Sequence, residues 1–89
     1  NSKSYILFSQ LSFLENEIKN YDSAIEFSSK ALLVKRNYGP ALIELAKSNV
    51  NLCNRAAADD AFKRARSYDR RQVGKLQDWA AEHYKTVCK

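Results

Sequence analysis

The chain has 89 residues, enough for one small domain over residues 1–89. It is 45% hydrophobic and 28% charged, and this composition excludes a disordered chain, which combines low hydrophobicity with high net charge. No apolar run approaches the roughly 20 residues that a transmembrane helix needs, so no membrane span is expected.

An internal period of 34 residues organises the sequence. A gapless shift by this period places small residues on small ones and large apolar residues on large apolar ones. The aligned sets are Ala24 with Ala58, Ala31 with Ala65, Asn20 with Asn54, Leu11 with Leu45 and Trp79, and Phe8 with Leu42 and Leu76. The period predicts one repeat over about residues 5–38, a second over about 39–72, and an additional helix over about 73–88.

The first repeat predicts two helices, because apolar residues recur at intervals of three and four. The expected core-facing stripe of the first helix is Leu7, Phe8, Leu11, Leu14 and Ile18. Asn20 is the expected N-cap of the second helix, since its side chain can accept hydrogen bonds from the first free backbone N–H groups. The core-facing stripe of the second helix is Ala24, Phe27, Ala31 and Val34.

The second repeat and the C-terminal segment predict three further helices. Asn37 and Asn54 are the expected N-caps of the third and fourth helices, and Pro40 is tolerated in the first turn of the third. The core-facing residues are Ala41, Leu42, Leu45, Ala46, Asn49 and Leu52, then Ala58, Ala61, Phe62, Ala65 and Tyr68, and finally Val73, Leu76, Trp79, Ala80, His83, Tyr84 and Val87. Short connections make neighbouring helices antiparallel, so we predict an all-α stack of helix hairpins without strands.

These features resemble the tetratricopeptide repeat, a 34-residue helix–turn–helix unit with a large, Leu, small pattern in its first helix and Ala, aromatic, Ala in its second. The matching residues are Leu42, Leu45, Ala46, Ala58, Phe62 and Ala65 in the second repeat, and Phe8, Leu11, Ser12, Ala24 and Ala31 in the first. The first repeat departs from the pattern at Ser28, where the family favours an aromatic residue. The resemblance implies a right-handed α-solenoid of five helices that serves as a scaffold or adaptor.

The resemblance also implies a partner-binding groove on the concave face, along the first helix of each unit. The groove residues are Ile6, Ser9, Phe13, Asn16, Ile43, Lys47, Val50, Asn51, Gln77, Tyr84 and Lys85. Phe13 and Tyr84 are the expected hot spots, because aromatic residues often dominate binding energy. Lys47 and Lys85 favour a protein or peptide segment with acidic character, and we expect the chain to be part of a larger protein or complex.

Two alternative functions stay open from the sequence. One is binding of nucleic acid or an acidic partner through the basic stretch 55–75, and the other is self-association through the apolar groove residues. The basic face comprises Lys63, Arg64, Arg66, Arg70 and Arg71. One tetratricopeptide subfamily holds chaperone C-terminal tails through a Lys, Asn, Asn, Lys, Arg clamp, and such docking is not expected here. The matching positions carry Ser9, Phe13, Glu44, Gly74 and Asp78, none of which is the clamp residue.

No group of residues indicates an enzyme, a cofactor or a metal site. His83 is the single histidine, and we expect it to be partly buried and hydrogen-bonded on the fifth helix. His83 and Cys88 diverge by about 140° around a helix, so they form no nucleophile pair. Cys53 and Cys88 are expected to be free thiols, because they end helices that pack roughly 8–10 Å apart. Free thiols favour an intracellular, cytoplasmic location.

Overall fold

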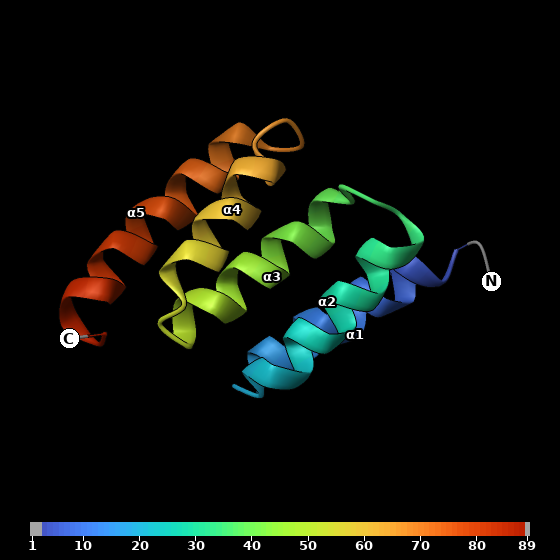
Figure 1. The fold of residues 1–89 in the computed structure, drawn as a ribbon, viewed down its shortest axis with the longest axis horizontal. Coiled ribbons are helices and arrows are strands. Elements are labelled where there is room, and N and C mark those ends of the chain that lie inside the picture. The colour runs from blue at the N-terminus through green and yellow to red at the C-terminus, as the bar shows by residue number, and fades with distance from the viewer. Residues whose placement is uncertain (1–2, 89) are drawn as a thin grey trace.

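The computed structural model describes residues 3–88, and these form five helices and no strand. The helices are α1 (Ser4–Glu17), α2 (Tyr21–Val34), α3 (Gly39–Asn51), α4 (Arg55–Ala65) and α5 (Arg70–Thr86). Two helix hairpins, α1–α2 and α3–α4, are followed by α5, and α3 lies between the first hairpin and the α4–α5 pair (Figure 1). The predicted all-α fold is confirmed, while the right hand of the stack stays a prediction.

The stack is elongated, measuring 41 × 26 × 18 Å along its principal axes. The N-terminal end of α1 and the C-terminal end of α5 lie at opposite ends of the long axis (Figure 1). Within residues 3–88, no helix is both long enough and apolar enough to cross a membrane.

The turns that end α1 and α3 share one geometry, and they lie 34 residues apart. Each contains a residue in the left-handed backbone region, Lys19 with φ of 64° and Cys53 with φ of 61°. The backbone N–H groups of Lys19 and Asn20 donate to carbonyls of the last turn of α1, and those of Cys53 and Asn54 do the same at α3. This is the Schellman arrangement, which satisfies carbonyl groups that a helix end leaves free.

Two of the three asparagines expected as N-caps occupy the N-cap position, but without the expected side-chain hydrogen bond. Asn20 and Asn54 do stand at the N-cap positions of α2 and α4, but neither side chain caps its helix. Each side chain instead donates from Nδ2 to the side chain five residues earlier, at 2.8 Å and 3.3 Å. The N-cap of α3 is Tyr38 and not Asn37, whose φ of 57° lies in the left-handed region.

The hydrophobic core lies in the second hairpin and α5. Its buried residues are Leu42, Ile43, Ala46, Val50, Ala58, Ala61, Phe62, Ala65, Val73 and Ala80. Phe62 is the largest fully buried side chain, and alanines on α3 and α4 leave room for it because small contact residues let two helices approach closely. Most of the predicted core of the third and fourth helices is therefore confirmed.

The predicted core stripe of the first helix is wrong at three of its five residues, while Phe8 and Leu11 are half-buried. Leu7, Leu14 and Ile18 are exposed, whereas the buried side chains of α1 are Ser9, Ser12 and Asn16. The buried polar groups are satisfied by hydrogen bonds, as a buried hydroxyl or amide requires. Ser12 Oγ, for example, donates to the carbonyl oxygen of Ala24 in α2 at 2.7 Å. Between α1 and α2 this hydrogen bond accompanies one expected apolar contact, the stacked rings of Phe8 and Phe27, whose centroids are 6.3 Å apart.

Several other predicted core residues are also exposed. They are Val34, Leu52, Tyr68, Trp79 and Val87. Tyr68 is exposed because α4 ends at Ala65, so that the tyrosine falls in the turn before α5 instead of on the inner face of a longer helix. His83 is half-buried, but its Nε2 has no hydrogen-bond partner, so the expected hydrogen bond is not formed at that atom.

Cys53 and Cys88 form a disulfide, and the prediction of free thiols is wrong. Their Cα atoms are 5.5 Å apart, within the range that a disulfide needs. The spacing of packed helix axes does not apply to them, because both residues lie just beyond the ends of α3 and α5. The bond joins the end of α5 to the end of α3. It also removes the reason for expecting a cytoplasmic location, since disulfides persist mainly in oxidising environments.

Candidate partner-binding site

A pocket of about 460 Å³ opens between α1, the first turns of α3 and the start of α5. It lies where the first hairpin meets the second half of the molecule. Its lining residues are Ser9, Gln10, Phe13, Leu14, Pro40, Ile43, Glu44, Tyr68 and Gln72. Phe13, Leu14 and Tyr68 are exposed apolar or aromatic side chains, and they line one pocket although they come from two distant parts of the chain.

Tyr68 reaches this pocket because Gly39 leaves room for its ring. A Cβ atom on Gly39 would overlap with Cγ of Tyr68, far inside van der Waals contact. The start of α3 and the turn before α5 therefore approach each other closely, with the Tyr68 ring packed against Gly39. The φ of Gly39 is not positive, so its backbone conformation does not require glycine. Glycine is required because the Tyr68 side chain occupies the space of a Cβ atom.

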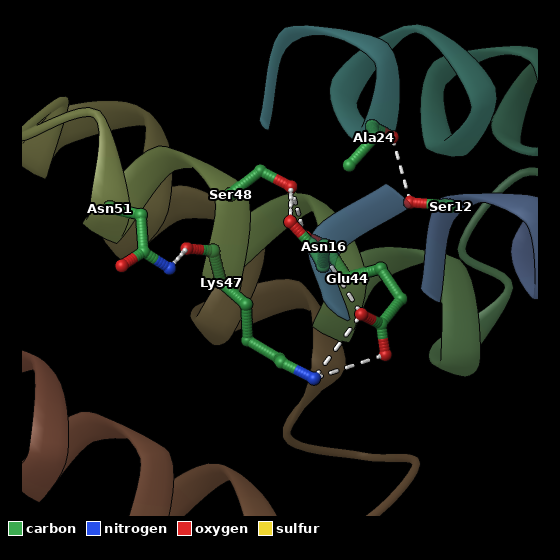
Figure 2. A network of polar contacts seen from close by, with 7 residues as sticks. All are labelled: Ser12, Asn16, Ala24, Glu44, Lys47, Ser48 and Asn51. Atoms are coloured by element: carbon green, nitrogen blue, oxygen red, sulfur yellow. Dashed lines mark hydrogen bonds and ion pairs between the residues drawn. The ribbon is translucent and has the colours of Figure 1, made fainter. Parts of the chain in front are cut away.

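A polar network next to the pocket joins α1 to α3 (Figure 2). Asn16 Nδ2 donates to the carbonyl oxygen of Glu44 at 3.1 Å and to its Oε1 at 3.0 Å. Asn16 Oδ1 accepts from Ser48 Oγ at 2.8 Å, and Lys47 Nζ lies 3.2 Å from Glu44 Oε1. The Glu44 carboxylate is buried but partnered, so this network holds the two helices together.

Lys47 also connects this network to the rim of the pocket. Its ammonium nitrogen lies 5.5 Å from the centre of the Phe13 ring, within the range of a cation–π contact. Because Lys47 contacts both Phe13 and Glu44, it fixes the position of the ring beside the pocket. Lys47, which the sequence predicted to favour an acidic partner, is only partly exposed, and its ammonium group is already paired with Glu44.

The structure brings some of the eleven predicted groove residues together and separates others. Ser9, Phe13 and Ile43 line the pocket, Asn16 and Lys47 belong to the adjoining network, and Ile6 is exposed on α1. Asn51 donates from Nδ2 to the carbonyl oxygen of Lys47 at 3.0 Å. Val50 is fully buried, so it offers no surface to a partner and its assignment to the groove is corrected.

The groove residues predicted on α5 do not line the same pocket. Gln77 and Tyr84 line a smaller cavity of about 190 Å³ together with Arg55 and Asp59 of α4, and Lys85 is exposed elsewhere on α5. The Arg55 guanidinium lies 5.0 Å from the centre of the Tyr84 ring. Burial raises the pKa of Tyr84 above its ordinary value of 10.0, Asp59 raises it further, and Arg55 opposes the rise.

The predicted basic face is exposed throughout. Lys63, Arg64, Arg66, Arg70 and Arg71 lie at the end of α4 and the start of α5, on both sides of Tyr68. Arg64 contacts Asp60 at 3.8 Å and donates to Asn37 Oδ1 at 3.4 Å. Asn37 in turn lines a second pocket of about 450 Å³ that shares Tyr68 and Pro40 with the first. Arg64 is therefore linked, through Asn37, to a pocket that shares the Tyr68 ring.

Sequence reasoning missed part of the pocket lining. The missed residues are Gln10, Leu14, Pro40, Glu44, Tyr68 and Gln72. Leu14 and Tyr68 were assigned to the core because both continue an apolar stripe at helical spacing. The available signal for Tyr68 was its position between Ser67 and Asp69, since Ser and Asp favour turns and helix starts.

Within residues 3–88, no group of three or more His, Cys, Asp or Glu residues could hold a metal ion. No protein-family model matches the chain, and neither a curated protein nor a solved structure matches it.

Proposed function

We propose that this chain is a non-catalytic, tetratricopeptide-type interaction module that binds a segment of a partner protein in the pocket between α1 and α3. The observation that carries the proposal is the convergence of exposed Phe13, Leu14 and Tyr68 on a cavity of about 460 Å³. Exposed apolar residues that line a concave site are typical of a binding surface. The recurrence of one turn geometry after 34 residues supports the repeat assignment.

The partner segment is proposed to carry an apolar anchor together with acidic residues. The anchor would enter between Phe13 and Tyr68, which become the expected hot spots in place of the pair Phe13 and Tyr84. Acidic residues would face Arg70 and Arg71, which are exposed next to Gln72 at the pocket edge. These outer charges should raise the association rate more than the final affinity, because exposed ion pairs contribute little net energy.

A peptide library selected on the immobilised, oxidised protein tests this proposal. We expect enriched peptides to combine a large apolar residue with Asp or Glu. Phe13→Ala and Tyr68→Ala should each weaken their binding by more than about 1 kcal/mol. Leu33→Ala is the matched control, because Leu33 is the most exposed leucine that the structure describes and lies on α2 outside the pocket. Circular dichroism should show that each variant retains its helix content.

The same selection separates the proposal from the alternative that the basic face alone is the working surface. If Arg64→Ala with Arg66→Ala abolished binding while the pocket variants had no effect, the pocket proposal would be wrong. Nucleic-acid binding would then be tested through its salt dependence, since contacts to phosphates give a steep loss of affinity with added salt.

A further inference from the structure

We propose that the outer face of α1 is a self-association surface on which α1 of a second copy of this chain packs antiparallel. The surface is a seam of four apolar residues, Leu7, Leu11, Leu14 and Ile18, spaced by four, three and four positions. This spacing is the heptad pattern by which one helix packs along another. Leu7, Leu14 and Ile18 are 56%, 55% and 69% exposed, and Leu11 is half-buried.

The equivalent face of α3 packs against another part of the chain, and its residues can be compared with the seam on α1. After the 34-residue shift, Leu11 corresponds to half-buried Leu45 and Ile18 to exposed Leu52. Leu7 corresponds to Ala41 and Leu14 to Ser48, and both of these are fully buried. They are buried because the first hairpin packs along α3, and Ser48 donates a hydrogen bond to Asn16 of α1. The same face of α1 carries larger apolar side chains, yet no helix of the described chain covers it.

The seam is complementary to itself, and this points to a second copy as the occupant. An antiparallel register centred between Ser12 and Phe13 places Leu7 of one copy opposite Ile18 of the other. The same register places Leu11 opposite Leu14. A two-fold axis then pairs every apolar seam residue with another one, as an isologous dimer interface requires.

The charges at the edges of the seam are compatible with this register. In the antiparallel arrangement, Glu17 of one copy lies across from Phe8 of the other, and Glu15 lies across from Gln10. No like charges of α1 therefore oppose each other, and the apolar stems of the edge residues can cover the rim of the seam.

This surface is separate from the pocket between α1 and α3, with which it shares only Leu14. The polar side of α1, with Ser9, Ser12 and Asn16, faces the interior of the chain, so the seam points away from α3. Leu7 and Ile18 do not line the pocket and are the residues to change. Their substitution tests self-association without removing the proposed peptide site.

Sedimentation equilibrium of the oxidised chain over a wide range of concentration provides the first test. We expect the wild-type protein to show a reversible monomer–dimer equilibrium. Leu7→Lys or Ile18→Glu should each weaken dimerisation by about tenfold or more, because each buries a charge at both ends of the symmetric seam. Leu33→Lys should leave the equilibrium unchanged, because Leu33 is exposed on α2 and lies outside the seam.

The double variant Leu7→Lys with Ile18→Glu tests the antiparallel register. In that register the introduced ammonium groups of one copy would face the introduced carboxylates of the other, so the double variant should dimerise more strongly than either single variant. A wild-type chain that stays monomeric at all concentrations would overturn the proposal. So would a dimer that both single variants leave intact, or a double variant that associates no better than the single ones.

Discussion

The two helix hairpins follow the same 34-residue frame but differ in the side chains that they bury at four equivalent positions. Each buried polar residue that the structure describes in the first hairpin corresponds to a buried apolar residue in the second. The pairs are Ser9 with Ile43, Ser12 with Ala46, Asn16 with Val50, and Ser28 with Phe62. The period therefore sets where the helices lie, while the side chains at equivalent positions decide how each interface is filled.

This difference predicts unequal stability along the chain. One hydrogen bond makes a net contribution of about 0.5–1.5 kcal/mol to the free energy of unfolding, whereas burial of a Val, Leu or Phe side chain contributes about 1.5–3 kcal/mol. The second hairpin, with α5, should be the last part to open, and the first hairpin should open earlier by local unfolding. Hydrogen exchange of the backbone amides of α2 and α4 would measure the difference directly.

The largest expected effect comes from removing the buried ring of the second hairpin. Phe62→Ala should destabilise the protein by about 3–5 kcal/mol, because the change removes buried apolar surface and leaves a cavity. Chemical denaturation followed by circular dichroism measures the loss. Leu33→Ala is the control for truncating an apolar side chain, and because Leu33 is 87% exposed its effect should be small. A Phe62→Ala variant as stable as this control would contradict the assignment of the core.

The next effect concerns the disulfide, which tethers only the C-terminal half. Replacing Cys53 and Cys88 by Ser should lower the free energy of unfolding by about 2–4 kcal/mol, because the unfolded chain is no longer closed into a loop. Thermal denaturation with and without reductant should show the same loss in the wild-type protein and none in the double variant. Two reactive thiols in the denatured, unreduced wild-type protein would show that the bond is absent.

A smaller effect is expected at Gly39, where the start of α3 meets the turn before α5. Gly39→Ala should destabilise the protein by about 1–3 kcal/mol, because its new methyl group forces Tyr68 to move. The equivalent position of the first repeat carries Tyr5, so the requirement belongs to the second repeat alone. Adding Tyr68→Ala should recover most of the loss, and denaturation of the single and double variants measures it.

Gly74→Ala is the matched control for this prediction. Nothing lies within 4 Å of a Cβ atom at Gly74, which is inside α5. The change should therefore stabilise the protein by about 0.5–1 kcal/mol, since alanine favours a helix more than glycine does. A similar loss at both glycines would refute the contact between Gly39 and Tyr68.

The smallest expected effect is at Ser28, the counterpart of Phe62. Ser28 Oγ donates only to the carbonyl oxygen of Ile25 in its own helix, at 3.0 Å. Ser28→Ala removes the hydroxyl group together with the single hydrogen bond that it donates. The free energy of unfolding should therefore change by less than about 1 kcal/mol. A loss as large as that of Phe62→Ala would show that the two hairpins depend equally on this position.

The sequence was sufficient to predict the helices, because periodic apolar residues, short connections and the 34-residue shift all depend on local pattern. It did not reveal which face of α1 is buried. Leu7, Leu14 and Ile18 form a regular stripe, and regular spacing alone does not say whether a stripe faces the core or a different surface. The partners that allow Asn16 and Ser12 to be buried lie on other helices and are visible only in three dimensions.

The pocket was predicted less well than the fold, because its Tyr68 wall depends on where α4 ends. Tyr68 continues the stripe of α4, but the helix stops at Ala65 and the ring turns toward Gly39. The disulfide was missed for a similar reason. Cys53 lies in a left-handed turn beyond α3, and a residue outside a helix end can approach a neighbour more closely than the helix axes do.

The bond between Cys53 and Cys88, which are 35 positions apart, closes the chain into a covalent ring that contains α4, the Tyr68 turn and α5. A protease that cuts once inside this ring, for example after exposed Arg66 or Arg70, would break the backbone without releasing a fragment. The nicked protein would keep its mass, apart from one added water molecule, until a reductant separates the two pieces. Electrophoresis with and without reductant would therefore locate the ring without any structural measurement.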